Sequence, residues 1–214
     1  MKNFVFVSDF DGTLTGNDFY KILSEAYLKE KYPPLFKAWK RGEMKDREYL
    51  SYIFNNISRT EAEIDEDIIN IPLDPFAKAF IENIKAAGGD FIIVSAGTSY
   101  YIDRVLKHHN IEGVKVYSNN GVFKESGLYF DLDEKDEFYS DRYGIDKLLV
   151  VEKIKQQYKK VFFAGDSGPD VKPALISDVV FAKGELVQLL EKEKAEFIEF
   201  KDFSQLWSKI QKFL

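Results

Sequence analysis

The chain has 214 residues, a length that suits one domain or one domain carrying an insertion. Hydrophobic residues make up 45% of it, so a folded core is expected, and a net charge of −6 without a basic stripe argues against a nucleic-acid partner. It contains no cysteine, no evident signal peptide and no apolar stretch of about 20 residues, so we expect a cytoplasmic protein without disulfides or a membrane partner.

The first predicted element is a strand over residues 4–8, FVFVS. Its continuous apolar run is typical of a strand buried on both faces of a parallel sheet. Similar runs follow at 90–95, 114–118, 160–165, 178–182 and 196–200. Helical patterns lie between or after them, at 74–87, 98–109, 145–158, 169–176, 184–194 and 203–213. This alternation predicts a doubly wound α/β fold, in which helices flank a parallel sheet.

Two segments interrupt the alternation. Residues 17–73 have a mostly helical pattern, which indicates a helical lid inserted after the first strand. The chain would then consist of a core, formed by residues 1–16 and 74–214, and a cap formed by residues 17–73. Residues 120–133, NGVFKESGLYFDLD, are typical of a β-hairpin that turns near Ser126.

Two acids, Asp9 and Asp11, follow the first strand directly. In an open α/β sheet, ligands bind beyond the carboxyl ends of the strands, so these carboxylates lie where a site is expected. A polar turn is the alternative, since Asp-Gly after a strand is common in turns. Ser95 ends the next core strand before Ala96 and a helix; it could bind an anion or simply cap that helix.

Near the carboxyl end of the chain, Asp166 and Asp170 follow the strand at 160–165. Carboxylates at a strand end between glycines suit a hard cation such as Mg²⁺. The alternative is a loop in which one of these residues caps the next helix, because it would have the same sequence pattern. Lys147 opens the helix that leads into this strand, and a single lysine there is usually a surface residue.

Taken in chain order, these features resemble the haloacid dehalogenase (HAD) superfamily of phosphohydrolases. The matching motifs are DFDGT at 9–13, Ser95, Lys147 and GDSGPD at 165–170, and the insertion lies where that family places its type-1 cap. The resemblance implies a Rossmann-like HAD core. DFDGTLT, SAG and GDSGPD are most similar to the phosphoserine-phosphatase-like branch, and residues 178–206 resemble its methionine-salvage phosphatases, which carry a cysteine-rich stretch where this chain has DRYGID.

The resemblance implies an Mg²⁺-dependent phosphomonoester hydrolase that acts on a small phosphorylated metabolite through an aspartyl-phosphate. Asp9 would be the nucleophile, and Asp11 the general acid and then the general base. Mg²⁺ would be held by Asp9, by the backbone carbonyl of Asp11 and by Asp166. Asp170 would either hold one of these ligands in place or bind the ion as a further ligand.

The same resemblance assigns the phosphoryl oxygens to Ser95, to Lys147 and to backbone N–H groups near Asp11 and Ala96. Thr13 would shape the turn after the first strand and donate a hydrogen bond to Asp9, fixing its rotamer.

Asp18 and Tyr20 are the candidate substrate contacts in the cap. Phosphoserine phosphatases use a cap arginine and a glutamate for the amino-acid head group, and counting along the chain places these near Tyr52 and Asp18. The cap is also rich in aromatic residues, which would favour a substrate with an apolar or ring portion. A methionine-salvage enol phosphate and a phosphoserine-like compound both stay open.

Two other functions stay open. A HAD-type phosphomutase or phosphotransferase shares the fold and the nucleophile but returns the phosphoryl group to an organic acceptor. A phospho-receiver signalling domain also forms an aspartyl-phosphate, but its aspartate follows the third strand of a smaller domain without a lid. The sequence leaves the oligomeric state undecided.

Overall fold

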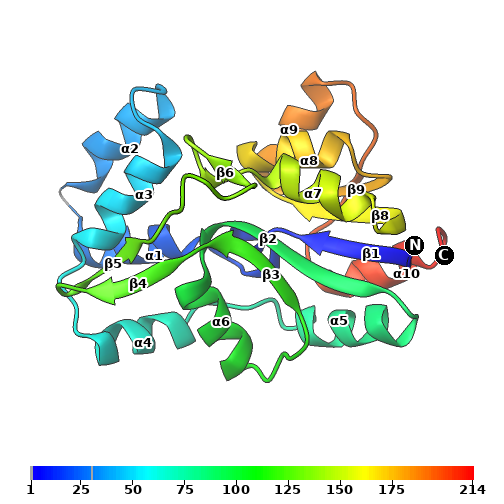
Figure 1. Cartoon of the computed structure of the whole chain (residues 1–214), viewed down its shortest axis with the longest axis horizontal. Helices are drawn as coiled ribbons and strands as arrows, with labels where there is room; N and C mark the ends of the chain where they lie inside the picture. Colours follow the sequence, from blue (N-terminus) through cyan, green and yellow to red (C-terminus); the bar gives the residue numbers. More distant parts are fainter. Residues whose placement is uncertain (1, 30) are drawn as a thin grey trace.

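The computed structural model describes residues 2–29 and 31–214. A six-stranded parallel sheet forms its centre, in the order β10-β9-β8-β1-β2-β3 (Figure 1). Its strands are β1 (Lys2–Ser8), β2 (Asp90–Thr98), β3 (Lys115–Asn119), β8 (Tyr158–Gly165), β9 (Val179–Ala182) and β10 (Ile198–Glu199). The predicted α/β fold with a parallel sheet is confirmed.

Helices cover both faces of the sheet, because alternate side chains of β1 point to opposite faces and those of residues 4–7 are all apolar and buried. Phe4 and Phe6 pack in one hydrophobic cluster with the helices on one face. Val5 and Val7 belong to a second cluster on the other face. The first face carries α5 (Ala77–Ala86), α6 (Ser99–His108) and α10 (Leu206–Ile210), and the second carries α7 (Lys147–Lys155), α8 (Val171–Leu175) and α9 (Gly184–Lys192).

Several helices are shorter than the sequence pattern predicts. The pattern at 74–87 begins at Asp74, whose carboxylate accepts hydrogen bonds from the backbone N–H groups of Phe76 and Phe203, whereas the regular helix α5 begins at Ala77. Short 3₁₀ segments, η2 (Gly168–Asp170) and η3 (Phe203–Gln205), begin the two helices predicted at 169–176 and 203–213.

Among the described residues of the insertion after β1 there are four helices, and they lie beyond the carboxyl end of that strand (Figure 1). They are α1 (Phe19–Tyr27), α2 (Tyr32–Lys40), α3 (Asp46–Asn55) and α4 (Glu61–Ile69). The chain enters and leaves this region side by side: the Gly16 N–H donates to the Pro72 carbonyl at 2.7 Å, and Thr15 bridges to Leu73. The division into a core and a cap of residues 17–73 stays a prediction.

Two small hairpins complete the fold. The predicted hairpin is present as β4 (Gly121–Lys124) and β5 (Gly127–Phe130), with φ angles of 49° and 61° at Glu125 and Ser126, as a type I′ turn requires. The second hairpin, β6 (Tyr139–Ser140) with β7 (Gly144–Ile145), was not predicted. Within residues 2–29 and 31–214, no helix has the length and apolar character needed to cross a membrane.

Candidate active site

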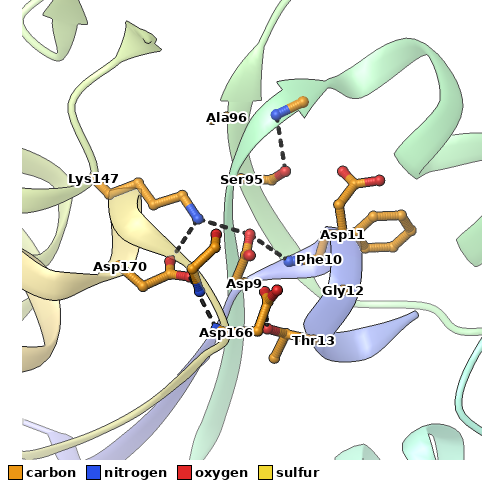
Figure 2. Close-up of polar contacts among 12 residues, drawn as sticks. Asp9, Phe10, Asp11, Gly12, Thr13, Ser95, Ala96, Lys147, Asp166 and Asp170 are labelled. Atoms are coloured by element: carbon orange, nitrogen blue, oxygen red, sulfur yellow. Dashed lines mark hydrogen bonds and ion pairs between the residues drawn. The ribbon is translucent and has the colours of Figure 1, made fainter. Parts of the chain in front are cut away.

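The carboxyl ends of β1, β2 and β8 meet at a cavity of 560 Å³, which the insertion helices line on its other side. Each of these strands brings one of the predicted residues to this edge: Asp9 follows β1, Ser95 lies in β2, and Asp166 follows β8. Lys147, the first residue of α7, reaches the same place (Figure 2). The structure therefore gathers side chains that lie far apart in the sequence.

Asp9 is held firmly at the end of β1. Its N–H continues the pairing with β8 by donating to the Ala164 carbonyl at 2.9 Å, and its carboxylate accepts from the Phe10 N–H at 2.7 Å. The chain then turns sharply at Gly12, where φ is +75°. A Cβ atom at Gly12 would lie 2.5 Å from the carboxylate of Asp166, so this turn needs glycine for its conformation and for space.

Lys147 is buried between two carboxylates. Its ammonium lies 2.7 Å from Asp9 and 2.7 Å from Asp170, and only 4% of its side chain is exposed (Figure 2). Burial lowers the pKa of Lys147, but the charges of Asp170 and Asp9 outweigh it, so the pKa is raised. Burial and the charge of Asp170 raise the pKa of Asp9 well above its usual range.

Asp9, Asp166 and Asp170 each offer a carboxylate oxygen, and these three atoms lie within 4.8 Å of one another. Asp170 also accepts hydrogen bonds from the backbone N–H groups of Asp166 and Ser167, both at 3.1 Å. Burial, followed by the charge of Asp170, raises the pKa of Asp166 to about 7. Three carboxylates around one ammonium leave an excess of negative charge, so the cluster fits a divalent cation with hard oxygen ligands.

The predicted hydrogen bond from Thr13 to Asp9 is wrong. The Thr13 hydroxyl donates to the Asp166 carboxylate at 2.8 Å instead, because the turn at Gly12 carries Thr13 toward the end of β8. Its carbonyl accepts from the Lys183 ammonium at 2.9 Å. Thr13 thus braces Asp166 rather than Asp9.

Asp11 lies on the opposite side of Asp9 from Lys147 (Figure 2). Its carboxylate is outside the three-carboxylate cluster and lines the cavity. One oxygen accepts from the Phe19 N–H at 2.9 Å, and the other accepts from the hydroxyl of Tyr101. Burial, followed by the charge of Asp18, raises the pKa of Asp11 to about 7.

The loop at Ser95 is braced from both sides. The regular pairing of β2 with β3 is interrupted between Val94 and Thr98, so the backbone departs from the sheet there. The Ser95 hydroxyl accepts from the Gly97 N–H at 3.0 Å, and the Ala96 carbonyl accepts from the Asn119 side chain at 2.8 Å. Ser95 and Ala96 both line the cavity.

The insertion contributes an aromatic and charged wall. Tyr20 lines the cavity and packs edge-on against Trp39. Asp18 also lines it, but its carboxylate is paired with Lys21. Tyr52, which counting places at the arginine of phosphoserine phosphatases, is not among the residues that line the cavity.

Charged residues from the core and the insertion meet in pairs around the cavity. Arg142, in the β6–β7 turn, binds the Asp46 carboxylate at 2.7 Å. Lys40 lies 3.3 Å from Glu185 of α9. Both pairs therefore link the insertion to the core beside the cavity.

Sequence reasoning missed several residues at this site. Tyr101 and Asn119 bind their partners only through tertiary contacts, and no sequence pattern marks them. Lys183 follows β9 directly, so the rule that ligands bind beyond strand ends could have found it.

Comparison with known proteins identifies the family. Residues 4–197 match the family described as "Putative Phosphatase". The chain belongs to this family. A curated relative, 2-hydroxy-3-keto-5-methylthiopentenyl-1-phosphate phosphatase of Bacillus velezensis, is 26% identical over 213 residues, covering 96% of this chain and 88% of that protein.

Solved structures show the same fold. A substrate-bound phosphoserine phosphatase complex matches with a TM-score of 0.72 and 18% identity, over 100% of this chain and 99% of that chain. A phospho-aspartyl intermediate analogue of phosphoserine phosphatase matches with a TM-score of 0.68 and 18% identity, over 100% of both chains. These structures show that the chain has the fold of the HAD phosphatases, and the family match shows that it is a phosphatase.

Proposed function

We propose that this HAD phosphatase is an Mg²⁺-dependent hydrolase that releases phosphate from a small phosphomonoester through an aspartyl-phosphate on Asp9. The observation that carries the proposal is the placement of Asp9: a buried carboxylate at the cavity floor, 2.7 Å from the Lys147 ammonium and beside Asp166 and Asp170. Phosphoryl transfer depends mainly on positioning and on neutralising charge, and this arrangement offers both.

In the first step, a carboxylate oxygen of Asp9 attacks phosphorus, and the bond from phosphorus to the ester oxygen breaks. Asp11 gives its proton to the departing oxygen. In the second step, Asp11 accepts a proton from water, whose oxygen attacks phosphorus and displaces Asp9, releasing inorganic phosphate. Asp9 and Asp11 are then both regenerated.

The remaining residues hold charges in place. Asp9, Asp166 and the backbone carbonyl of Asp11 would hold Mg²⁺, supported by Asp170; when bound, the ion offsets the repulsion between phosphate and carboxylate. Thr13 fixes Asp166 through its 2.8 Å hydrogen bond.

Three groups would bind the phosphoryl oxygens. Lys147 supplies a positive charge, the Ser95 hydroxyl supplies a donor, and the backbone near Ala96 supplies N–H groups. The brace from the Gly97 N–H fixes the position of the Ser95 oxygen, and its hydrogen can turn toward a phosphoryl oxygen.

The cap wall favours a substrate whose organic part carries no charge. Each lysine or arginine that lines the cavity on the side of the insertion already has a carboxylate partner. The pairs are Lys21 with Asp18, Lys40 with Glu185, and Arg142 with Asp46. An amino-acid head group would have to compete with these carboxylates for the cations, whereas an uncharged group can pack on the aromatic wall.

A methionine-salvage enol phosphate is therefore the better candidate, and phosphoserine the poorer one. The name of the Bacillus velezensis relative points the same way. Asp18 would act by neutralising Lys21, and Tyr20 by contacting the organic part of the substrate.

A phosphate-release screen over phosphorylated metabolites with Mg²⁺ tests the proposal. We expect hydrolysis of several neutral-headed phosphates and weak hydrolysis of O-phosphoserine. Asp9→Asn should reduce release to background, whereas Asp131→Asn, which changes an exposed acid, should not. Retention of more than a few per cent of the activity in Asp9→Asn would overturn the covalent route. Transfer of phosphate to an organic acceptor without release into water would instead identify a phosphomutase.

A further inference from the structure

Tyr101 makes a contact that the mechanism above does not use. This residue lies on α6, and its hydroxyl donates a hydrogen bond to one carboxylate oxygen of Asp11. The other oxygen accepts from the Phe19 N–H at 2.9 Å. Asp11 is thus held at both oxygens, by a core helix on one side and by the first residue of α1 on the other.

The ring of Tyr101 is fixed in place. Only 1% of the residue is exposed, and its ring packs against Phe19 at 4.9 Å, Phe10 at 6.0 Å and Phe54 at 6.2 Å between ring centres. A side chain so enclosed cannot swing away without disrupting the core. Its hydroxyl therefore stays at the edge of the cavity, directed at Asp11.

Gly97 keeps the path from Tyr101 to Asp11 open. A Cβ atom there would lie 1.7 Å from the Tyr101 hydroxyl oxygen and 2.9 Å from the Asp11 carboxylate. Gly97 itself lies in the loop that carries Ser95, so the phosphate-binding loop and the Tyr101–Asp11 contact are packed against each other.

We propose that Tyr101 is a positioning residue for the phosphatase reaction: its hydroxyl holds the Asp11 carboxyl in the orientation from which it serves the leaving oxygen. This rests on the proposed function. Proton transfer needs the acid within hydrogen-bond reach of the leaving group, and a carboxyl held at one oxygen alone can rotate out of line. The Phe19 N–H belongs to the insertion, whereas Tyr101 belongs to the core. Tyr101 is therefore the core residue that holds the Asp11 carboxyl in place.

The test compares two tyrosines that are neighbours on α6. Tyr101→Phe removes the hydroxyl that binds Asp11 and keeps the ring. Tyr100→Phe removes a hydroxyl that donates to Glu61 at 2.9 Å and that does not line the cavity. kcat/KM is measured with Mg²⁺ for 4-nitrophenyl phosphate, phenyl phosphate and a primary alkyl phosphate, and thermal unfolding is recorded for each variant.

An alkoxide is a poor leaving group and needs the acid, whereas 4-nitrophenolate leaves without a proton. General acid catalysis contributes about 10²–10⁴-fold, so loss of alignment in Tyr101→Phe should cost about 10-fold or more on the alkyl phosphate. The loss on 4-nitrophenyl phosphate should stay within about 3-fold. Tyr100→Phe should leave the ratio of the two substrates unchanged.

Equal losses on every substrate, or no loss on any, would overturn the proposal. So would the same change of ratio in Tyr100→Phe. Tyr101→Phe is also combined with Asp11→Asn, and formation of the phosphoenzyme from 4-nitrophenyl phosphate and from phenyl phosphate is followed. If Tyr101 acts through Asp11, its substitution adds no further leaving-group dependence in the Asp11→Asn background, and an added effect there contradicts it.

These outcomes separate this proposal from the proposed function. A parent protein that releases no phosphate from any compound would overturn both. A parent that is active and loses activity in Asp9→Asn, but whose Tyr101→Phe variant keeps the parental ratio of substrates, retains the proposed function and refutes only the role of Tyr101.

Discussion

Lys147 is expected to stabilise the fold as well as bind phosphate. Its ammonium is the cation that contacts Asp9 and Asp170, each at 2.7 Å, and all three side chains are buried. Lys147→Met keeps most of the stem that packs in the core but removes this charge. The carboxylates of Asp9, Asp166 and Asp170 would then repel one another without compensation.

The size of the effect follows from these distances. Two unit charges 2.7 Å apart attract by about 6 kcal/mol at an effective dielectric constant of 20, and Lys147 makes two such contacts. The cost of burying the ammonium offsets part of this, and breaking a buried pair typically costs about 3–5 kcal/mol. For a protein of this size, that loss lowers Tm by about 6–20 °C.

The assay is thermal unfolding in EDTA at pH 7.5 and pH 5.5. Lys153→Met is the matched control, because Lys153 lies on the same helix and pairs with Glu137 at the surface. Lys147 lowers the pKa of Asp9, which burial and the charge of Asp170 already raise above its usual range, so without Lys147 the folded pKa of Asp9 rises further. Protonation then stabilises the folded variant as the pH falls, so its deficit relative to the parent should shrink at pH 5.5.

Two results would refute this reasoning. A fall in Tm of less than about 2 °C at pH 7.5, equal to that of Lys153→Met, would mean that the carboxylates do not depend on Lys147. A deficit that stays constant or grows at pH 5.5 would mean that repulsion between carboxylates is not its cause.

Three further predictions concern the same site. EDTA should abolish phosphate release and added Mg²⁺ should restore it; full activity in chelator, with the metal shown to be absent, would contradict the role of Asp166. Burial raises the pKa of Asp11 to about 7, above its unfolded value, so this group stabilises the folded state at low pH and the effect is lost as pH rises toward 7. In EDTA, the Tm of the parent should therefore fall more than the Tm of Asp11→Asn when the pH rises from 5 to 7.5. An equal fall in both proteins would argue against a raised pKa of Asp11. Gly97→Ala should lower both Tm and activity, because its Cβ would lie 1.7 Å from the Tyr101 hydroxyl oxygen; parental values for both would show that the loop can shift.

The location of the site could be predicted from the sequence because it depends on local pattern. Continuous apolar runs mark the buried strands, and the acids that follow two of them mark the edge of the sheet where ligands bind. This pattern predicts Asp9, Asp166 and Ser95 at the site, and their order along the chain resembles that of the HAD phosphatases. The parallel sheet and the first hairpin followed from the same periodicity.

The partners of each side chain were decided by the tertiary structure alone. Thr13 bonds to Asp166, 153 positions away, and Tyr101 bonds to Asp11, 90 positions away, so no local pattern could reveal either contact. The β6–β7 hairpin has strands of two residues, too short to show a periodic signal, yet it carries Arg142 to the insertion. Local sequence determines the buried strands, the longer helices and the sheet edge where the acids lie, whereas the packing of elements against one another determines which charged and polar groups meet.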